Sequence, residues 1–359
     1  MANYKLARIF GVLLLVLIWG CSSGGDDPAP GGDCYCDFTS WTDSSAALNI
    51  TFEKQTVAKP ANVSVLFKVQ SKDGTPVPGL LAADFTVYEN DALISQYESQ
   101  QAIIPKPGQF KSHIMLLLDL SGSILNSDSL TKVKQASKSF ISAVMPDAGT
   151  ENFGAIDMGI YWFDGAADIH QLVSSFITDK NFLLSSIDGI NENISKDAST
   201  NLYGAVVSGI DKVKKAIDSS QQFVSVASLV MFTDGTDQAG RLRKEDALNA
   251  VSNAAKTISV YSIGLGGEID ETVLKGIGKN GFVFAQDLEE LVPKFEQIAS
   301  KIKDDVNSHY LLQYCSPKRK ASHTLKLVAK SKELTGTLKT CFCATGFEGG
   351  CKVTVPSGT

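Results

Sequence analysis

The chain has 359 residues, of which 43% are hydrophobic and 20% are charged, and its formal net charge is −6 at pH 7. This is the composition of a globular protein that is long enough for two domains. A mildly acidic chain without a long basic block argues against a nucleic-acid-binding surface, so we expect no nucleic-acid partner.

The first twenty residues have the layout of a secretory signal peptide. Lys5 and Arg8 precede an apolar run over residues 9–19, which is too short to span a bilayer. Cys21 follows Gly20 directly, and this arrangement resembles the lipobox of bacterial lipoproteins, in which the cysteine is lipidated and becomes the mature N-terminus. The alternative is a signal peptide that merely has Cys21 nearby. We expect residues 1–20 to be a lipoprotein signal peptide and the lipid on Cys21 to hold the protein in a membrane.

A polar segment follows Cys21. Residues 22–33 consist almost entirely of Gly, Ser, Asp and Pro, which cannot pack a core. We therefore expect residues 21–44 to be the lipidated cysteine and a flexible tether. Ser22, in place of an aspartate, resembles the outer-membrane version of the lipoprotein signal. The expected location is the cell envelope, with the anchor in the outer membrane.

Six cysteines remain once Cys21 is set aside, and they lie at the two extremes of the expected mature chain. They are Cys34, Cys36, Cys315, Cys341, Cys343 and Cys351. An even number in an exported protein favours disulfides, although the sequence leaves fifteen pairings open. The two C-x-C pairs could instead form a four-thiolate zinc site.

Residues 45–111 have the texture of β-strands. Segments 62–70 (NVSVLFKVQ) and 84–90 (DFTVYEN) alternate or run β-branched and aromatic. A Gly/Pro turn cluster, KDGTPVPG, separates them. We predict a β-rich domain here.

Residues 112–305 alternate between strand and helix. The predicted strands are 113–120, 153–163, 228–234 and 257–265, and the predicted helices are 129–145, 201–217, 244–256 and 288–306. The strands are apolar along their whole length and the helices have apolar residues at three- and four-residue spacing. This pattern predicts a mostly parallel, Rossmann-like α/β sheet with helices on both faces.

The β texture returns in residues 306–359. Neither flank of the α/β segment has enough strands for a sandwich, but together they give the roughly seven short strands of an immunoglobulin-like fold. We therefore expect the α/β domain to be inserted into a discontinuous Ig-like β-sandwich made of residues 45–111 and 306–359. Disulfides would then join the start of the mature chain to its end.

Polar residues stand at the ends of two predicted strands and at the start of one helix. Asp119 ends the first strand and Ser121 and Ser123 follow at alternate positions, while Asp234 ends a later strand and Thr200 begins a helix. Ligands of open α/β sheets bind beyond the carboxyl ends of the strands, so these residues can converge. The alternative is a set of polar turns without a ligand.

The combination of D-x-S-x-S, TNLYGA and FTDG in this order resembles the von Willebrand factor A domain and its metal-ion-dependent adhesion site. The resemblance covers residues 112–305. It implies that Ser121 and Ser123 bind a metal directly, that Thr200 binds it directly or through water, and that Asp119 and Asp234 act mainly through waters.

A site of this kind suits Mg²⁺, or another divalent cation such as Mn²⁺ or Ca²⁺, because these ions prefer oxygen ligands. Hydroxyl ligands leave most of the ion's charge uncompensated, so an open position would attract a carboxylate from outside. We expect an adhesion-type protein of the bacterial cell envelope whose partner is a protein that presents an acidic residue.

Two alternatives compete with this interpretation. One is an envelope assembly or sensing factor that binds another envelope protein. The other is a metal-dependent hydrolase, but phosphatases with a strand-end aspartate need a second acid two residues later, where this chain has Ser121. The expectation is therefore no enzymatic activity. In the loop after Asp234, the side chains of Asp237 and Arg241 either contact a partner or are solvated, and we expect them to be solvated.

Overall fold

The computed structural model describes residues 34–36, 40–43, 45–95, 102–104, 110–150, 153–173, 175–220, 224–267 and 269–353. The expected signal peptide, Cys21 and most of the expected tether lie outside these residues. Within the described ranges, no helix has the length and apolar character needed to cross a membrane.

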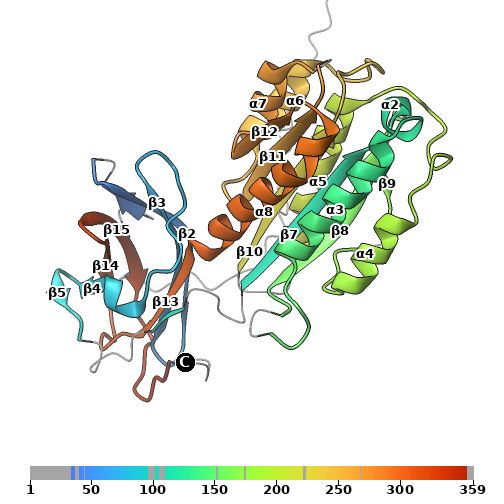
Figure 1. The fold of residues 1–359 in the computed structure, drawn as a ribbon. Helices are drawn as coiled ribbons and strands as arrows, with labels where there is room; N and C mark the ends of the chain where they lie inside the picture. The colour runs from blue at the N-terminus through green and yellow to red at the C-terminus, as the bar shows by residue number, and fades with distance from the viewer. Residues whose placement is uncertain are drawn as a thin grey trace, which may run out of the picture.

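A six-stranded sheet forms the centre of the α/β unit, with the strand order β12-β11-β10-β7-β8-β9 (Figure 1). Its strands are β7 (Phe110–Asp119), β8 (Ile156–Phe163), β9 (His170–Gln171), β10 (Val224–Thr233), β11 (Ile258–Leu265) and β12 (Gly281–Ala285). All neighbours pair in parallel except β9, which is antiparallel at one edge. The predicted mostly parallel sheet is confirmed.

Helices cover both faces of this sheet, as the apolar strands require. One apolar core holds side chains of α3 (Ser129–Val144), α4 (Lys180–Asp188) and α8 (Leu291–Asn307). The other holds side chains of α5 (Leu202–Ser219), α6 (Lys244–Asn253) and α7 (Glu271–Ile277). Two short elements, α2 (Gly122–Leu125) and the 3-10 turn η2 (Leu288–Glu290), precede α3 and α8. The sequence did not predict α4, α7, β9 or β12, since each is too short to show a clear period.

Strands from both sides of the α/β unit build two antiparallel sheets, with the orders β1-β15-β14-β4-β5 and β2-β3-β13-β6. The strands are β1 (Ser40–Thr42), β2 (Leu48–Ala58), β3 (Asn62–Ser71), β4 (Phe85–Glu89), β5 (Ala92–Leu93), β6 (Ala102–Ile104), β13 (His309–Cys315), β14 (Ser322–Ser331) and β15 (Leu334–Cys343), with a 3-10 turn η1 (Ala82–Asp84) before β4.

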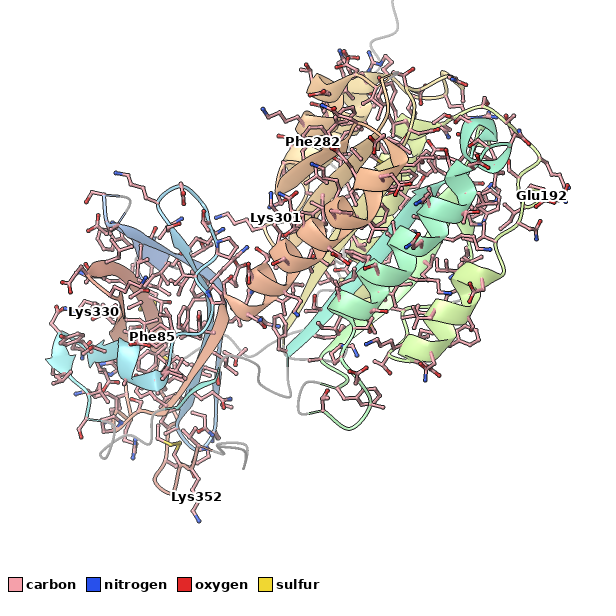
Figure 2. The ribbon with its side chains drawn as sticks, in the orientation of Figure 1. Phe85, Glu192, Phe282, Lys301, Lys330 and Lys352 are labelled. Carbon is pink, nitrogen blue, oxygen red and sulfur yellow. A yellow bond between two sulfur atoms is a disulfide. The ribbon has the colours of Figure 1, made fainter. Side chains whose placement is uncertain are left out.

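The two antiparallel sheets share one apolar core. Phe85, which is labelled in Figure 2, belongs to the first sheet. Its ring lies 5.6 Å from that of Phe67 and 5.3 Å from that of Tyr310, both on the second sheet. Strands that precede and follow the α/β unit therefore fold together. That these two sheets form an immunoglobulin-like sandwich stays a prediction.

All six cysteines outside the signal region form disulfides, which confirms that prediction and excludes a zinc site built from them. The pairs are Cys34–Cys343, Cys36–Cys341 and Cys315–Cys351. The first two attach residues 34–36 to the end of β15, and the third closes a loop within the C-terminal region.

Buried charges lie where the α/β unit meets the β-sheets. Helix α8 leads directly into β13, and Lys68 of β3 makes an ion pair with Asp305 of α8. Ser259 of β11 donates a hydrogen bond of 3.2 Å to the same carboxylate. Burial lowers the pKa of His309, the first residue of β13, to about 4, so its imidazole is neutral at pH 7. Through Asp305, α8 thus contacts β3 of the antiparallel sheets and β11 of the α/β sheet.

Replacing Glu53 by glutamine is expected to change how stability depends on pH. Glu53 is the extra residue of a β-bulge in β2, and burial raises its pKa to about 7 against the attraction of Lys68 and Lys256. The folded chain therefore holds a proton that the unfolded chain, with a pKa near 4.5, has released. Glu53 thus costs stability as the pH rises from about 4.5 to 7, by about 3 kcal/mol in total.

Denaturant unfolding at a series of pH values measures this effect. The variant and the natural chain should be equally stable near pH 4, and the variant should be the more stable above pH 7. A difference that does not vary with pH would contradict the burial of this carboxyl group.

Candidate metal-binding site

The site lies where the order of the parallel strands reverses. From β7 the chain moves to β8 on one side and then returns past β7 to β10 on the other. Such a reversal leaves a crevice at the carboxyl ends of the two strands that flank it. Asp119 ends β7, and Asp234 directly follows β10, which pairs with β7.

Hydrogen bonds link four of the five predicted ligands. The Asp119 carboxylate accepts the backbone N–H of Ser121 at 3.0 Å and the hydroxyl of Thr233 at 2.6 Å. The hydroxyl oxygens of Ser121 and Ser123 are 3.3 Å apart. Ser123 in turn donates to Asp234 Oδ1 at 2.9 Å. The structure therefore brings these side chains to one point.

Thr200, the fifth predicted ligand, faces the same place from the loop before α5. It lines a groove of about 670 Å³ together with Ser123 and Asp234. Its backbone carbonyl accepts hydrogen bonds from the N–H groups of Gln238 at 2.8 Å and Ala239 at 3.0 Å. The loop after β10 thereby fixes the backbone that carries the Thr200 hydroxyl.

The electrostatics of the site favour a cation. Asp119 is fully buried, and burial together with the negative charge of Asp234 raises its pKa to about 7. The hydrogen bonds from Thr233 and Ser121 oppose this rise. A carboxylate buried beside a second one is unfavourable unless a positive charge lies near both.

The donor set fits a hard divalent cation. Three hydroxyls and two carboxylates are the oxygen ligands that Mg²⁺, Mn²⁺ and Ca²⁺ prefer. The described residues contain no cluster of three or more His, Cys, Asp or Glu side chains that could hold a metal. For an ion held here, the hydroxyls of Ser121, Ser123 and Thr200 would be available as ligands beside the two carboxylates.

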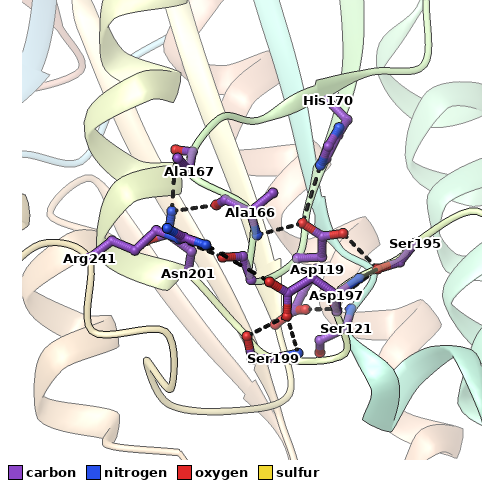
Figure 3. A network of polar contacts seen from close by, with 12 residues as sticks. Asp119, Ser121, Ala166, Ala167, His170, Ser195, Asp197, Ser199, Asn201 and Arg241 are labelled. Atoms are coloured by element: carbon purple, nitrogen blue, oxygen red, sulfur yellow. Dashed lines mark hydrogen bonds and ion pairs between the residues drawn. The ribbon is translucent and has the colours of Figure 1, made fainter.

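The prediction that the side chains of Asp237 and Arg241 are solvated holds for Arg241, whose side chain is 44% exposed, whereas Asp237 is partly buried. Asp237 accepts the backbone N–H of Tyr203 at 3.1 Å. Arg241 donates through Nε to the carbonyl of Gly165 at 2.6 Å (Figure 3). Both side chains make structural contacts because the loop folds back against the start of α5. The alternating polar residues of this loop give no sign of these partners in sequence.

Asp164, which directly follows β8 and is 2% exposed, was not among the residues predicted from the sequence. Like Asp119 and Asp234, it is an acid at the end of an apolar strand. Its position at the end of an apolar strand could have identified Asp164 from the sequence.

Residues 113–298 match the family model of the von Willebrand factor type A domain. Two curated relatives are calcium-activated chloride channel regulator 3A-1 of Mus musculus, 26% identical over 188 residues, and inter-alpha-trypsin inhibitor heavy chain H1 of Mesocricetus auratus, 23% identical over 207 residues. The alignments cover 52% and 55% of this chain but only 19% and 21% of those proteins. The chain thus spans about a fifth of the length of these relatives.

Two solved structures are similar at a lower level. Proximal thread matrix protein 1 from the mussel byssus, with a zinc-occupied MIDAS motif, is 15% identical with a TM-score of 0.44. The alignment covers 54% of this chain and 48% of that protein. The von Willebrand factor type A protein from Catenulispora acidiphila is 10% identical with a TM-score of 0.45 and covers 88% of this chain and 76% of its own. Similarity at this level says nothing about what this chain binds.

Proposed function

Because this chain belongs to the von Willebrand factor type A domain family, we propose that it is a metal-dependent protein-binding protein that holds Mg²⁺ at Ser121, Ser123 and Thr200. The observation that carries the proposal is the hydrogen-bonded convergence of Asp119, the two serines and Asp234 at one end of the sheet. A bound ion would supply a Lewis-acidic site for a carboxylate.

The protein's own residues prepare this site in two ways. The hydroxyls of Ser121, Ser123 and Thr200 are neutral and leave the charge of an ion largely uncompensated. Asp119 is buried beside Ser121, and Asp234 lines the groove next to Ser123; these two acids favour a cation at this end of the sheet. The groove in front has room for a protein segment that brings an acidic side chain. We therefore expect the partner to contribute the last ligand.

The proposed setting is the surface of a bacterial cell envelope. The sequence pattern around Cys21 supports a lipid anchor, and the three disulfides support an oxidising compartment. The proposed role is adhesion; assembly or sensing within the envelope would use the same metal site with a partner on the same cell.

A pull-down from envelope extract and from intact foreign cells tests the proposal, with the natural chain and Asp234→Ala each assayed in Mg²⁺ and in EDTA. We expect capture of a partner by the natural chain in Mg²⁺ and a loss of at least about tenfold in EDTA or in the variant. The matched control is Asp188→Ala, an exposed acid of α4 that pairs with Lys138, and it should capture as the natural chain does. Equal capture in all four conditions would contradict the proposal, and phosphatase activity that requires Asp234 would favour the hydrolase instead.

A further inference from the structure

Asp164 connects the loop after β8 to the loop over residues 195–200, which leads to Thr200. Its carboxylate is almost completely buried and both oxygens are occupied: Oδ1 accepts the backbone N–H of Ala166 at 2.8 Å and lies 3.2 Å from His170 Nε2, while Oδ2 accepts the hydroxyl of Ser195 at 2.6 Å. The first two contacts shape the loop after β8, and the third reaches the loop that leads to Thr200. The side chain of Asp164 therefore links these two loops.

The residue next to Thr200 is held by the same turn. The backbone N–H of Asn201 donates to the carbonyl of Asp164 at 2.9 Å, and its side-chain amide donates to the carbonyl of Ala166 at 2.8 Å (Figure 3). The amide oxygen of Asn201 also accepts the N–H of Gly204 and caps α5. The start of α5 is thus attached to the turn that Asp164 organises.

A second acid braces the loop before Thr200. Asp197 accepts both the N–H and the hydroxyl of Ser199, and it lies 3.9 Å from Arg241, which binds the carbonyl of Gly165. Gly165 has no side chain, and a Cβ there would overlap the hydroxyl of Ser199. The two loops are therefore closely packed at Gly165.

The same loop also contacts the serine-bearing segment. The N–H of Gly122, between Ser121 and Ser123, donates to the carbonyl of Ala198 at 2.9 Å. The loop over residues 195–200 is thus fixed on one side by Asp164 and on the other by the segment that carries Ser121 and Ser123. A displacement of Ser195 would therefore be transmitted along this loop to Thr200.

From this geometry we infer that Asp164 is a positioning residue for the metal site: through the loop over residues 195–200, it fixes the place of Thr200 relative to Ser121 and Ser123 without itself being a ligand. The inference rests on the proposed metal site. It adds Asp164, which lies outside the D-x-S-x-S, TNLYGA and FTDG segments that carry the family resemblance. Residues that orient metal ligands commonly change metal affinity by about 10- to 100-fold when they are replaced.

A double-mutant cycle with Mn²⁺ as the probe tests the inference on the full chain. Mn²⁺ affinity is measured for the natural chain, Asp164→Asn, Thr200→Ala and the double variant. We expect Asp164→Asn and Thr200→Ala each to weaken binding about tenfold, and the double variant to bind no more weakly than Thr200→Ala alone. The effect of Asp164 should therefore disappear once its target hydroxyl is absent.

A matched control separates positioning from a general loss of stability. Asp157 is also a buried acid of β8, but it pairs with His113 and Lys111 at the other end of the strand. Asp157→Asn should lower the melting temperature without changing Mn²⁺ affinity. Independent, multiplicative losses in the cycle, or equal losses in Asp157→Asn, would overturn the inference while leaving the metal site intact. A natural chain that binds no Mn²⁺ would overturn the proposed function and this inference together.

Discussion

Replacing Asp119 by asparagine is expected to reverse the order of stability between the variant and the natural chain when Mg²⁺ is added. In EDTA the variant should be more stable by about 1–2 kcal/mol, because the natural chain buries a carboxylate beside Asp234. At a Mg²⁺ concentration a hundredfold above its dissociation constant, the natural chain should gain about 2.7 kcal/mol. The variant should gain almost nothing.

The asparagine keeps the shape of the side chain and an acceptor for the N–H of Ser121, so the fold should survive. Denaturant unfolding in EDTA and in Mg²⁺ gives the four stabilities that are needed. Asp188→Asn, on the surface of α4, is the matched control and should gain from Mg²⁺ as the natural chain does. A variant at residue 119 that still gains stability from Mg²⁺ would contradict a metal site at the end of β7.

The two disulfides at the N-terminal end are expected to act as substitutes for each other. Cys36–Cys341 and Cys34–Cys343 close nearly the same loop, with sequence separations of 305 and 309. Once one is present, the other closes only a ring of a few residues. Serine replacement of either pair should therefore cost about 2 kcal/mol, while replacement of both should cost roughly 8 kcal/mol.

The third disulfide provides the comparison. Cys315–Cys351 closes a separate loop with a sequence separation of 36, so its removal alone should cost about 4 kcal/mol. Unfolding of the three single-pair variants and the double-pair variant measures these differences. Costs that simply add for the two N-terminal pairs would contradict the shared-loop interpretation.

The α/β architecture could be predicted because its central strands are apolar throughout, and a strand of that kind must be covered on both faces. The helices α3, α5, α6 and α8 could be predicted because each packs one apolar side into a core beside the sheet, which gives its sequence a helical period. Helix α7 and strand β12 were not, because seven and five residues are too few to establish a period.

The sequence identified the residues that we propose as metal ligands, but not the contacts that support them. Asp119 and Asp234 follow apolar strands, which identifies them from sequence. The contacts of Asp164, Asp197 and Arg241 depend on loops that meet only after the strands have paired, so sequence spacing does not indicate them. The disulfide pairing was open for the same reason, since the topology that brings residues 34–36 to β15 selects one pairing from fifteen.

Crystals of the full chain grown with Mn²⁺ would test the metal site most directly, through an anomalous difference map. We expect one peak at about 2.0–2.2 Å from the hydroxyls of Ser121 and Ser123, with Thr200 next to it and a water or a foreign carboxylate oxygen on the open side. A map from saturated crystals with no peak between these residues would contradict the site and the binding function proposed for it.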